Sequence, residues 1–135
     1  MNVRLLTALF LAFGLLLTAN LSVAQSAGYS QAQTGADQVV LTRSRLQHIM
    51  ARHWPDSTAT GAGKFQAGIT EASLRDMINE AVHNGRARRN THGRPGTIYE
   101  YDFQRQIGTT IDGGPATRLR VVVSNRNEVI TAFPF

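Results

Sequence analysis

Residues 41–53 form the first helical pattern in the chain. Apolar side chains recur there at the three- and four-residue spacing of one helical face, together with a histidine at the end of the stripe: Leu41, Leu46, Ile49, Met50 and His53. Thr42 supplies a side-chain oxygen for capping the first turn. Pro55 disfavours helical geometry in the residue before it, so we expect the helix to end at or before Trp54.

A second and clearer helical pattern follows a polar loop at residues 56–64. Thr70 is a suitable N-cap, and Glu71 places a negative charge in the first turn, where the helix dipole favours it. The apolar stripe of this helix comprises Leu74, Met77, Ile78, Ala81 and Val82. We expect Asn84 and Gly85 to end the helix, with the glycine in the left-handed conformation.

Beyond the second helix the pattern changes from a period of 3.6 to a period of 2. We expect residues 86–96 to be a basic loop with four arginines, Arg86, Arg88, Arg89 and Arg94. Tyr99, Tyr101 and Phe103 then alternate with Glu100 and Asp102, which predicts a strand with one apolar face. Further strands are expected at residues 107–111, 119–124 and 128–133, with turns at 112–115 and 125–127. This order predicts an α+β domain with two N-terminal helices packed on an antiparallel sheet of three to four strands.

The first 24 residues have the three parts of a secretory signal peptide. Arg4 gives a positive start, and the apolar run at residues 5–19 is too short and too weakly flanked to span a bilayer. Small residues at Ser22 and Ala24 predict cleavage after Ala24, the alternative being an uncleaved N-terminal anchor. We expect residues 25–38 to be a flexible lead and residues 39–135 to form one domain. The protein is then a secreted or periplasmic monomer without membrane attachment after cleavage.

The charge of the chain is basic and is carried by arginine. Lys64 is the single lysine among 14 basic residues, which stand against nine acidic ones and leave a formal net charge of +5. Such an excess in a small exported domain indicates an anionic partner, such as nucleic acid, anionic lipid or a cell-wall polymer. The guanidinium fork favours phosphate among these. A genome rich in arginine codons explains the same excess without a partner.

The residue inventory excludes several reaction types. The chain has no cysteine, hence no thiol nucleophile, disulfide or lipoprotein anchor, and no G-x-S-x-G turn. His48 and His53 are five residues apart rather than the four that align two metal ligands on a helix, and no H-E-x-x-H motif is present. We therefore expect neither a metal site nor a cofactor.

What remains is His48, His53 and Lys64, near a helix end and a glycine-rich loop. This set suits metal-free cleavage of RNA: one imidazole takes the proton of the ribose 2′-hydroxyl, a second donor protonates the leaving 5′-oxygen, and a cation stabilises the charge on phosphorus. Each residue also has a structural interpretation, with His53 in the core, His48 on the surface and Lys64 in a solvated loop. The two histidines lie about 140° apart on a regular helix. Either the helix unwinds before His53 or only one of them is catalytic; we expect His53 to be essential and His48 to be its partner.

Three segments of the chain resemble bacterial ribonucleases of the barnase–EndoU-like group. Residues 47–53, QHIMARH, are similar to the H-x-x-x-x-H opening of RNase A-like toxin domains from contact-dependent inhibition systems. The segment Gly63-Lys64-Phe65, followed by a helix containing Ile-Asn-Glu-Ala, resembles EndoU nucleases. Residues 128–134 resemble the closing strand of both families, which ends in Thr-x-aromatic-Pro. Because the segments occur in the same order as in those families, the resemblance extends over residues 41–135.

The resemblance implies a metal-independent, toxin-type endoribonuclease that cleaves single-stranded RNA and has a cognate inhibitor (immunity) protein. It places His48, His53, Lys64 and Thr131 in catalysis and Phe133 in RNA binding. Phe133 stands where some of these toxins have tyrosine, and a phenyl ring stacks on a base but donates no proton. One rival hypothesis is a non-enzymatic secreted module that binds anionic polymers through the arginine-rich loop and needs neither histidine. Another is an enzyme-like fold that has lost activity.

Overall fold

The structure, a computed structural model, describes residues 38–135. The expected signal peptide, its cleavage site and all but the last residue of the expected lead lie outside the described residues. No helix within residues 38–135 is long and apolar enough to cross a membrane.

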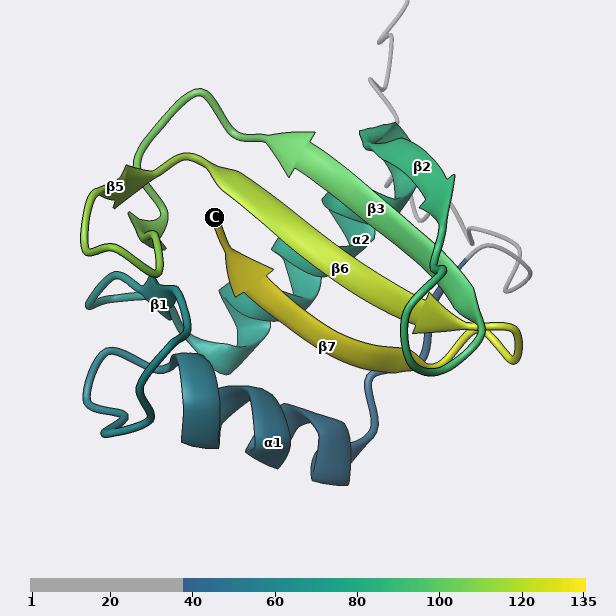
Figure 1. The fold of residues 1–135 in the computed structure, drawn as a ribbon, viewed down its shortest axis with the longest axis horizontal. Helices are drawn as coiled ribbons and strands as arrows, with labels where there is room; N and C mark the ends of the chain where they lie inside the picture. Colours follow the sequence, from purple (N-terminus) through teal and green to yellow (C-terminus); the bar gives the residue numbers. More distant parts are fainter. Residues whose placement is uncertain (1–37) are drawn as a thin grey trace, which may run out of the picture. The chain divides into compact units, whose positions relative to one another are not determined.

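Two helices precede most of the strands (Figure 1). Helix α1 spans Arg43–His53 and helix α2 spans Glu71–Asn84. Both are capped by the predicted threonines: Thr42 accepts a hydrogen bond from the Arg45 amide, and Thr70 forms a reciprocal capping box with Ser73. Helix α1 ends immediately before Trp54, as the proline that follows predicts.

The end of α2 differs from the prediction. Gly85 has φ −78° and an extended backbone, not the left-handed conformation. A Cβ atom at this position would collide with the carbonyl oxygens of Ala81 and Glu100. Glycine is therefore required because a carbonyl of the helix's own last turn and one of the sheet leave no room for a side chain, not because the turn needs a positive φ.

The strands form two antiparallel sheets. The larger sheet has the order β2 (Arg86–Arg89), β3 (Gly96–Asp102), β6 (Arg118–Ser124) and β7 (Val129–Pro134). The smaller sheet has the order β1 (Lys64–Phe65), β4 (Gly108–Thr109) and β5 (Pro115–Ala116). The α+β class is confirmed, whereas the expectation of a single sheet is wrong. Strands of two residues carry no readable alternation, so only their long-range pairing reveals the smaller sheet.

The expected basic loop at residues 86–96 begins as a strand. In β2, Arg86 lies opposite Glu100 of β3, and Arg88 lies opposite Ile98. All four residues of β2 are exposed, so this edge strand lacks the apolar alternation of a half-buried strand. The loop is reduced to residues 90–95.

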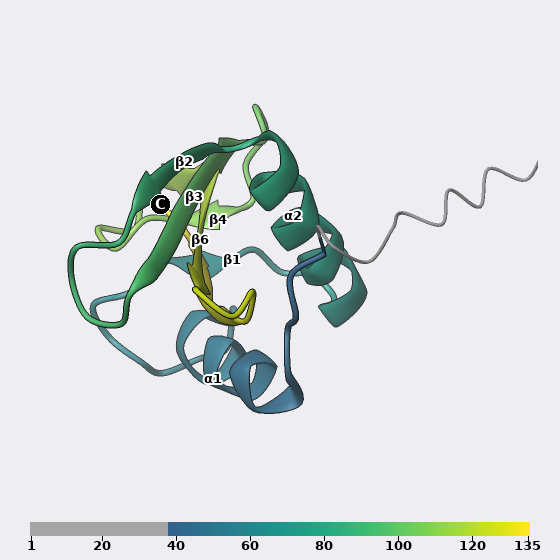
Figure 2. The same ribbon diagram turned by 90° about the vertical axis from the view of Figure 1, so that its right-hand side faces the viewer.

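The core lies between the helices and one face of the larger sheet. Helix α2 contacts β3 and β6, and α1 contacts β7; Figure 2 shows α2 on one side of the sheet. The sheet contributes five buried side chains to this core: Leu119, Val121, Val123, Val129 and Ala132. Tyr99, Tyr101 and Phe103 pack against it, which confirms their predicted common face.

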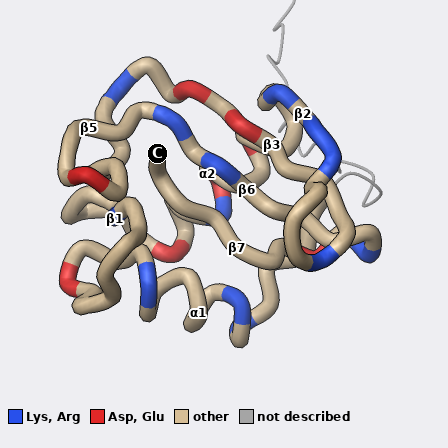
Figure 3. Tube along the Cα trace, viewed as in Figure 1, with Lys and Arg blue, Asp and Glu red and all other residues tan. Residues whose placement is uncertain are grey.

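The opposite face of the larger sheet, called the outer face below, carries polar, aromatic and aliphatic side chains. The strand register aligns two rows across it. One row is Arg86, Glu100, Arg120 and Phe133; the other is Arg88, Ile98, Val122 and Thr131. Figure 3 shows basic residues on β2, on β6 and on α1. The outer face thus presents positive charge beside α1.

Candidate active site

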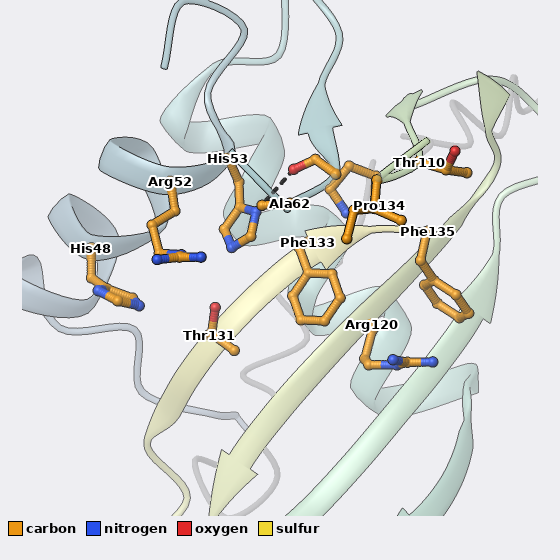
Figure 4. A pocket seen from close by; sticks show the side chains of 13 residues that line it. His48, Arg52, His53, Ala62, Thr110, Arg120, Thr131, Phe133, Pro134 and Phe135 are labelled. Atoms are coloured by element: carbon orange, nitrogen blue, oxygen red, sulfur yellow. Dashed lines mark hydrogen bonds between the residues drawn. The ribbon is translucent and has the colours of Figure 1, made fainter. Parts of the chain in front are cut away.

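A cavity of about 590 Å³ lies between α1 and the outer face of β6 and β7 (Figure 4). Helix α1 lines it with His48, Arg52 and His53, and the sheet lines it with Arg120, Thr131, Phe133 and Phe135 beyond the end of β7. Residues 61–63, residues 110–111 and Pro134 supply the remaining wall. Four expected site residues that are far apart in the sequence therefore meet here: His48, His53, Thr131 and Phe133.

His53 is buried and fixed in one orientation. Its side chain is only 6% exposed, and Nδ1 lies 2.9 Å from the carbonyl oxygen of Gly63. A carbonyl only accepts hydrogen bonds, so Nδ1 carries the proton and Nε2 keeps its lone pair. The ring stacks on Phe133, with centroids 5.2 Å apart and planes 19° apart. In Figure 4 the second ring nitrogen points into the cavity, on the side of Arg52 and Thr131.

The surroundings of His53 favour its neutral form. Burial lowers the pKa of His53 and is the largest influence. The hydrogen bond to Gly63 raises the pKa in part, and the positive charges of Arg52 and Lys64 lower it further. A neutral imidazole with a free Nε2 is a proton acceptor at neutral pH.

Gly63 fixes the carbonyl that orients His53. A Cβ atom on Gly63 would collide with the backbone oxygen of Pro134 and would lie 2.8 Å from that of Thr109. The chain passes between β4 and the end of β7 with no room for a side chain. The glycine-rich loop thus positions the catalytic candidate through a close backbone approach.

His48 and Arg52 occupy the exposed side of the cavity. Helix α1 stays regular through His53, so the alternative in which the helix unwinds before His53 is wrong. His48 and Arg52 are four residues apart and therefore share one face of the helix. The cavity extends around the side of α1, so both histidines line it although their positions on the helix diverge by about 140°.

Arginines of β2 and β6 surround one carboxylate next to the cavity. Arg120 Nε lies 2.8 Å from Glu100 Oε1, and Arg88 and Arg118 approach the same carboxylate at 3.1 and 3.6 Å. Burial alone raises the pKa of Glu100, but the hydrogen bond from Arg88 and the charge of Arg120 outweigh it and hold the pKa below its usual value. Glu100 is therefore ionised, and three guanidinium groups around one carboxylate leave an excess of positive charge.

Two of these arginines also lie over aromatic rings at the chain's C-terminal residues. The guanidinium carbon of Arg120 is 4.2 Å from the ring centroid of Phe135 and 5.7 Å from that of Phe133. Arg118 lies 4.6 Å from the same Phe135 ring. Stacking and ion pairing hold Arg120 in a single place at the cavity wall.

Lys64 does not line this cavity. Its Nζ donates hydrogen bonds to the carbonyl oxygens of Arg52 at 2.7 Å and Ala59 at 2.6 Å, and to Ser57 Oγ at 3.1 Å. These bonds tie the loop after α1 to the last turn of the helix, where carbonyl oxygens lack helical partners. The expected phosphate-binding lysine is thus a structural tie in this geometry, and Arg52 and Arg120 are the cations of the cavity.

The four arginines expected to bind RNA are separated by the fold. Arg86 and Arg88 lie on the outer face, whereas Arg89 pairs with Thr97 and therefore points to the opposite face. Arg94 lies in the hairpin loop at residues 90–95, which joins β2 to β3. Alternation along β2 therefore splits a run that reads as one basic segment in the sequence.

The cavity-lining residues that sequence reasoning missed include Arg52, Ile111, Arg120 and Phe135. Arg52 had a readable signal, because it stands one helical turn after His48. Arg120 had none, because its place beside Phe133 depends on the register between β6 and β7. Within residues 38–135 no three His, Asp or Glu side chains are grouped as a metal site requires.

Comparison with protein-family models, with curated proteins and with solved structures gives no match to this chain. The assignment of a function therefore depends on the cavity and on the resemblance of the short segments described above.

Proposed function

We propose that this protein is a secreted or periplasmic endoribonuclease that cleaves single-stranded RNA without a metal or cofactor. The observation that carries the proposal is the tautomer and orientation of the His53 ring. Its Nδ1 proton is held by Gly63 and its Nε2 faces a cavity that also contains a second histidine, two arginines and a threonine hydroxyl. The signal-like segment at residues 1–24 supports export.

In the proposed reaction, His53 Nε2 accepts the proton of a ribose 2′-hydroxyl. The 2′-oxygen forms a bond to the adjacent phosphorus, and the bond from phosphorus to the 5′-oxygen breaks. Protonated His48 donates a proton to that departing oxygen. The products are a 2′,3′-cyclic phosphate and a 5′-hydroxyl, with both protons accounted for.

The charge that develops on the phosphoryl oxygens meets Arg52 and Arg120. The hydroxyl of Thr131 points toward α1 in Figure 4 and supplies a further hydrogen-bond donor. Phe135 and Ile111, which is 63% exposed at the cavity edge, offer apolar surface to bases. Single-stranded RNA fits this arrangement because its bases are free to leave the stack.

The test is incubation of the purified protein with end-labelled RNA in excess EDTA, beside a DNA oligonucleotide of the same sequence. We expect the RNA to be cut, with 2′,3′-cyclic phosphate ends, and the DNA to stay intact. Equal cutting of the 2′-deoxy substrate would remove the proposed nucleophile and contradict this mechanism.

The second candidate function is a non-enzymatic module that binds anionic polymers. The excess of guanidinium groups around Glu100 favours it, since that cluster attracts phosphate whether or not chemistry follows. Binding of RNA without cleavage, unaltered in a His53→Asn variant, would select this alternative.

On the resemblance alone, we also propose a cognate inhibitor as a partner. An acidic protein that covers the cavity complements its arginines. A small acidic protein encoded beside this chain is expected to abolish cleavage when added in equimolar amount; a neighbouring protein without effect on cleavage would contradict this.

A further inference from the structure

A second cavity, of about 470 Å³, adjoins the candidate active site on the outer face of the larger sheet. It lies under the β2–β3 hairpin loop, and we call it the hairpin cavity. Arg120, Thr131 and Phe133 line both cavities and form their common wall. A ligand that fills the active site can therefore continue into the hairpin cavity without leaving the protein surface.

The hairpin cavity combines apolar and cationic walls. Ile98, Val122 and Ile130 form its apolar part, and Arg88 and Arg94 supply positive charge. Its volume lies within the range of about 300–1,000 Å³ that is typical of small-molecule sites. Apolar side chains beside guanidinium groups are the chemistry that receives a nucleobase and its phosphate.

The hairpin loop is held in shape by its own backbone and by Asn90. The Asn90 side chain donates to the carbonyl oxygen of Arg94 at 2.9 Å and accepts from the His92 amide at 3.2 Å. The backbone N–H of Asn90 donates to the carbonyl oxygen of Gly96 at 2.9 Å. Among residues 38–135, Arg94 forms no ion pair, unlike Arg88, which pairs with Glu100. Arg94 is thus a cation on an ordered loop with its charge available.

We infer that the hairpin cavity binds one further nucleotide of the RNA chain, next to the two nucleotides that flank the scissile phosphate. This inference depends on the proposed ribonuclease function for its substrate. The base packs on Ile98, Val122 and Ile130, and its phosphate meets Arg94. The protein then recognises a stretch of at least three nucleotides.

The experiment compares a tetranucleotide RNA with a dinucleotide RNA in the intact protein, in Arg94→Gln and in a control. Arg105→Gln is the control, because Arg105 is also an exposed arginine but lies over Phe103, outside both cavities. The ratio of kcat/KM for the longer over the shorter RNA is expected to fall about tenfold in Arg94→Gln, the scale of one lost hydrogen bond to a charged group, and to stay unchanged in the control.

Two results separate the failure of this inference from the failure of the proposed function. A length ratio that Arg94→Gln leaves unchanged overturns the hairpin site while cleavage stands. Absence of cleavage for every RNA overturns the ribonuclease proposal. In that case the affinities of a 2′-deoxy dinucleotide and a 2′-deoxy tetranucleotide are compared to test whether the hairpin cavity binds a nucleotide. The site is supported if the tetranucleotide binds more tightly than the dinucleotide and Arg94→Gln removes this difference. The salt dependence of binding should then also weaken by about one phosphate contact. A difference in affinity that survives in Arg94→Gln overturns the site.

Discussion

His53 combines a structural position with a chemically available atom. Burial, the hydrogen bond to Gly63 and the stacked Phe133 ring agree with its interpretation as a core histidine. The same contacts set the tautomer and leave Nε2 facing the cavity. A buried histidine at the end of an apolar stripe can thus satisfy one ring nitrogen in the core and offer the other to a substrate.

The first prediction separates these two roles of His53. Asparagine keeps a donor near the position of Nδ1 but has no nitrogen at Nε2, so His53→Asn is expected to stay folded. We expect its cleavage rate to fall about 10²- to 10⁴-fold, the usual contribution of a general acid–base group. Single-turnover RNA cleavage measures the rate, and circular dichroism with thermal melting measures folding.

His53→Ala provides the comparison, because it also leaves the Gly63 carbonyl without its donor and is expected to destabilise the fold by about 1–3 kcal/mol. Full activity in His53→Asn would show that His53 is a core residue only. His48→Ala tests the proposed acid at an exposed position, where the expected loss is in rate and not in stability.

At the scale of elements, the short segment between α1 and β1 sets the geometry of the site. The Gly63 carbonyl accepts a hydrogen bond from His53, and the next residue, Lys64, bonds the loop to the last turn of α1. The chain thereby connects the helix, the smaller sheet and the end of β7 within a few residues. Lys64 contributes to the site through this tie.

The second prediction concerns Lys64→Met, which keeps the aliphatic stem and removes three hydrogen bonds. We expect the free energy of unfolding to fall by about 1–3 kcal/mol, with kcat little changed at temperatures where the variant is fully folded. Denaturant unfolding and cleavage at saturating RNA measure the two quantities. A large loss of kcat without a loss of stability would instead restore Lys64 as a phosphate-binding cation.

At the scale of the whole molecule, charge and packing are divided between the two faces of the larger sheet. One face holds the core against the helices, and the other gathers arginines, aromatic rings and the two adjoining cavities. His53 contributes to both, because Nδ1 forms its hydrogen bond in the buried interior and Nε2 faces the cavity. The pH dependence of folding therefore reports on the site.

The third prediction gives the sign of that pH dependence. The pKa of His53 is lower in the folded chain than its ordinary value of 6.5, so the unfolded chain binds this proton more readily. The contribution to stability is complete above about pH 6.5 and is lost as the pH falls through the lowered pKa. Thermal unfolding of the wild type and of His53→Asn between pH 4 and 8 measures it.

We expect the stability advantage of the wild type over His53→Asn to shrink as the pH falls. Glu100, whose pKa stays low because Arg88 and Arg120 outweigh its burial, titrates in both proteins and cancels in the difference. Parallel pH profiles for the two proteins would contradict the environment described for His53.

Local signals in the sequence determined much of the fold. Thr42, Thr70 and Pro55 act on adjacent backbone groups, so the helix ends they predict occur in the structure. The alternation from Tyr99 to Phe103 likewise depends on a single strand, with one face toward the core and the other away from it. Four expected site residues line one cavity: His48 and His53, which residue type and spacing suggested, and Thr131 and Phe133, which only the resemblance of residues 128–134 to known ribonucleases implied. Their chemical roles stay predictions.

Only the tertiary structure decided the features that depend on partners outside a residue's own element. The smaller sheet pairs segments that are far apart in the sequence, and β2 is recognised as a strand only by its pairing with β3. At Gly85 a side chain would meet the carbonyl oxygen of Glu100 in β3 as well as that of Ala81. Arg120 and Lys64 are both basic, but register carries one into the cavity and local carbonyl oxygens hold the other away from it. A sequence pattern reports the environment of a residue's own element; which groups that element meets depends on how distant segments pack.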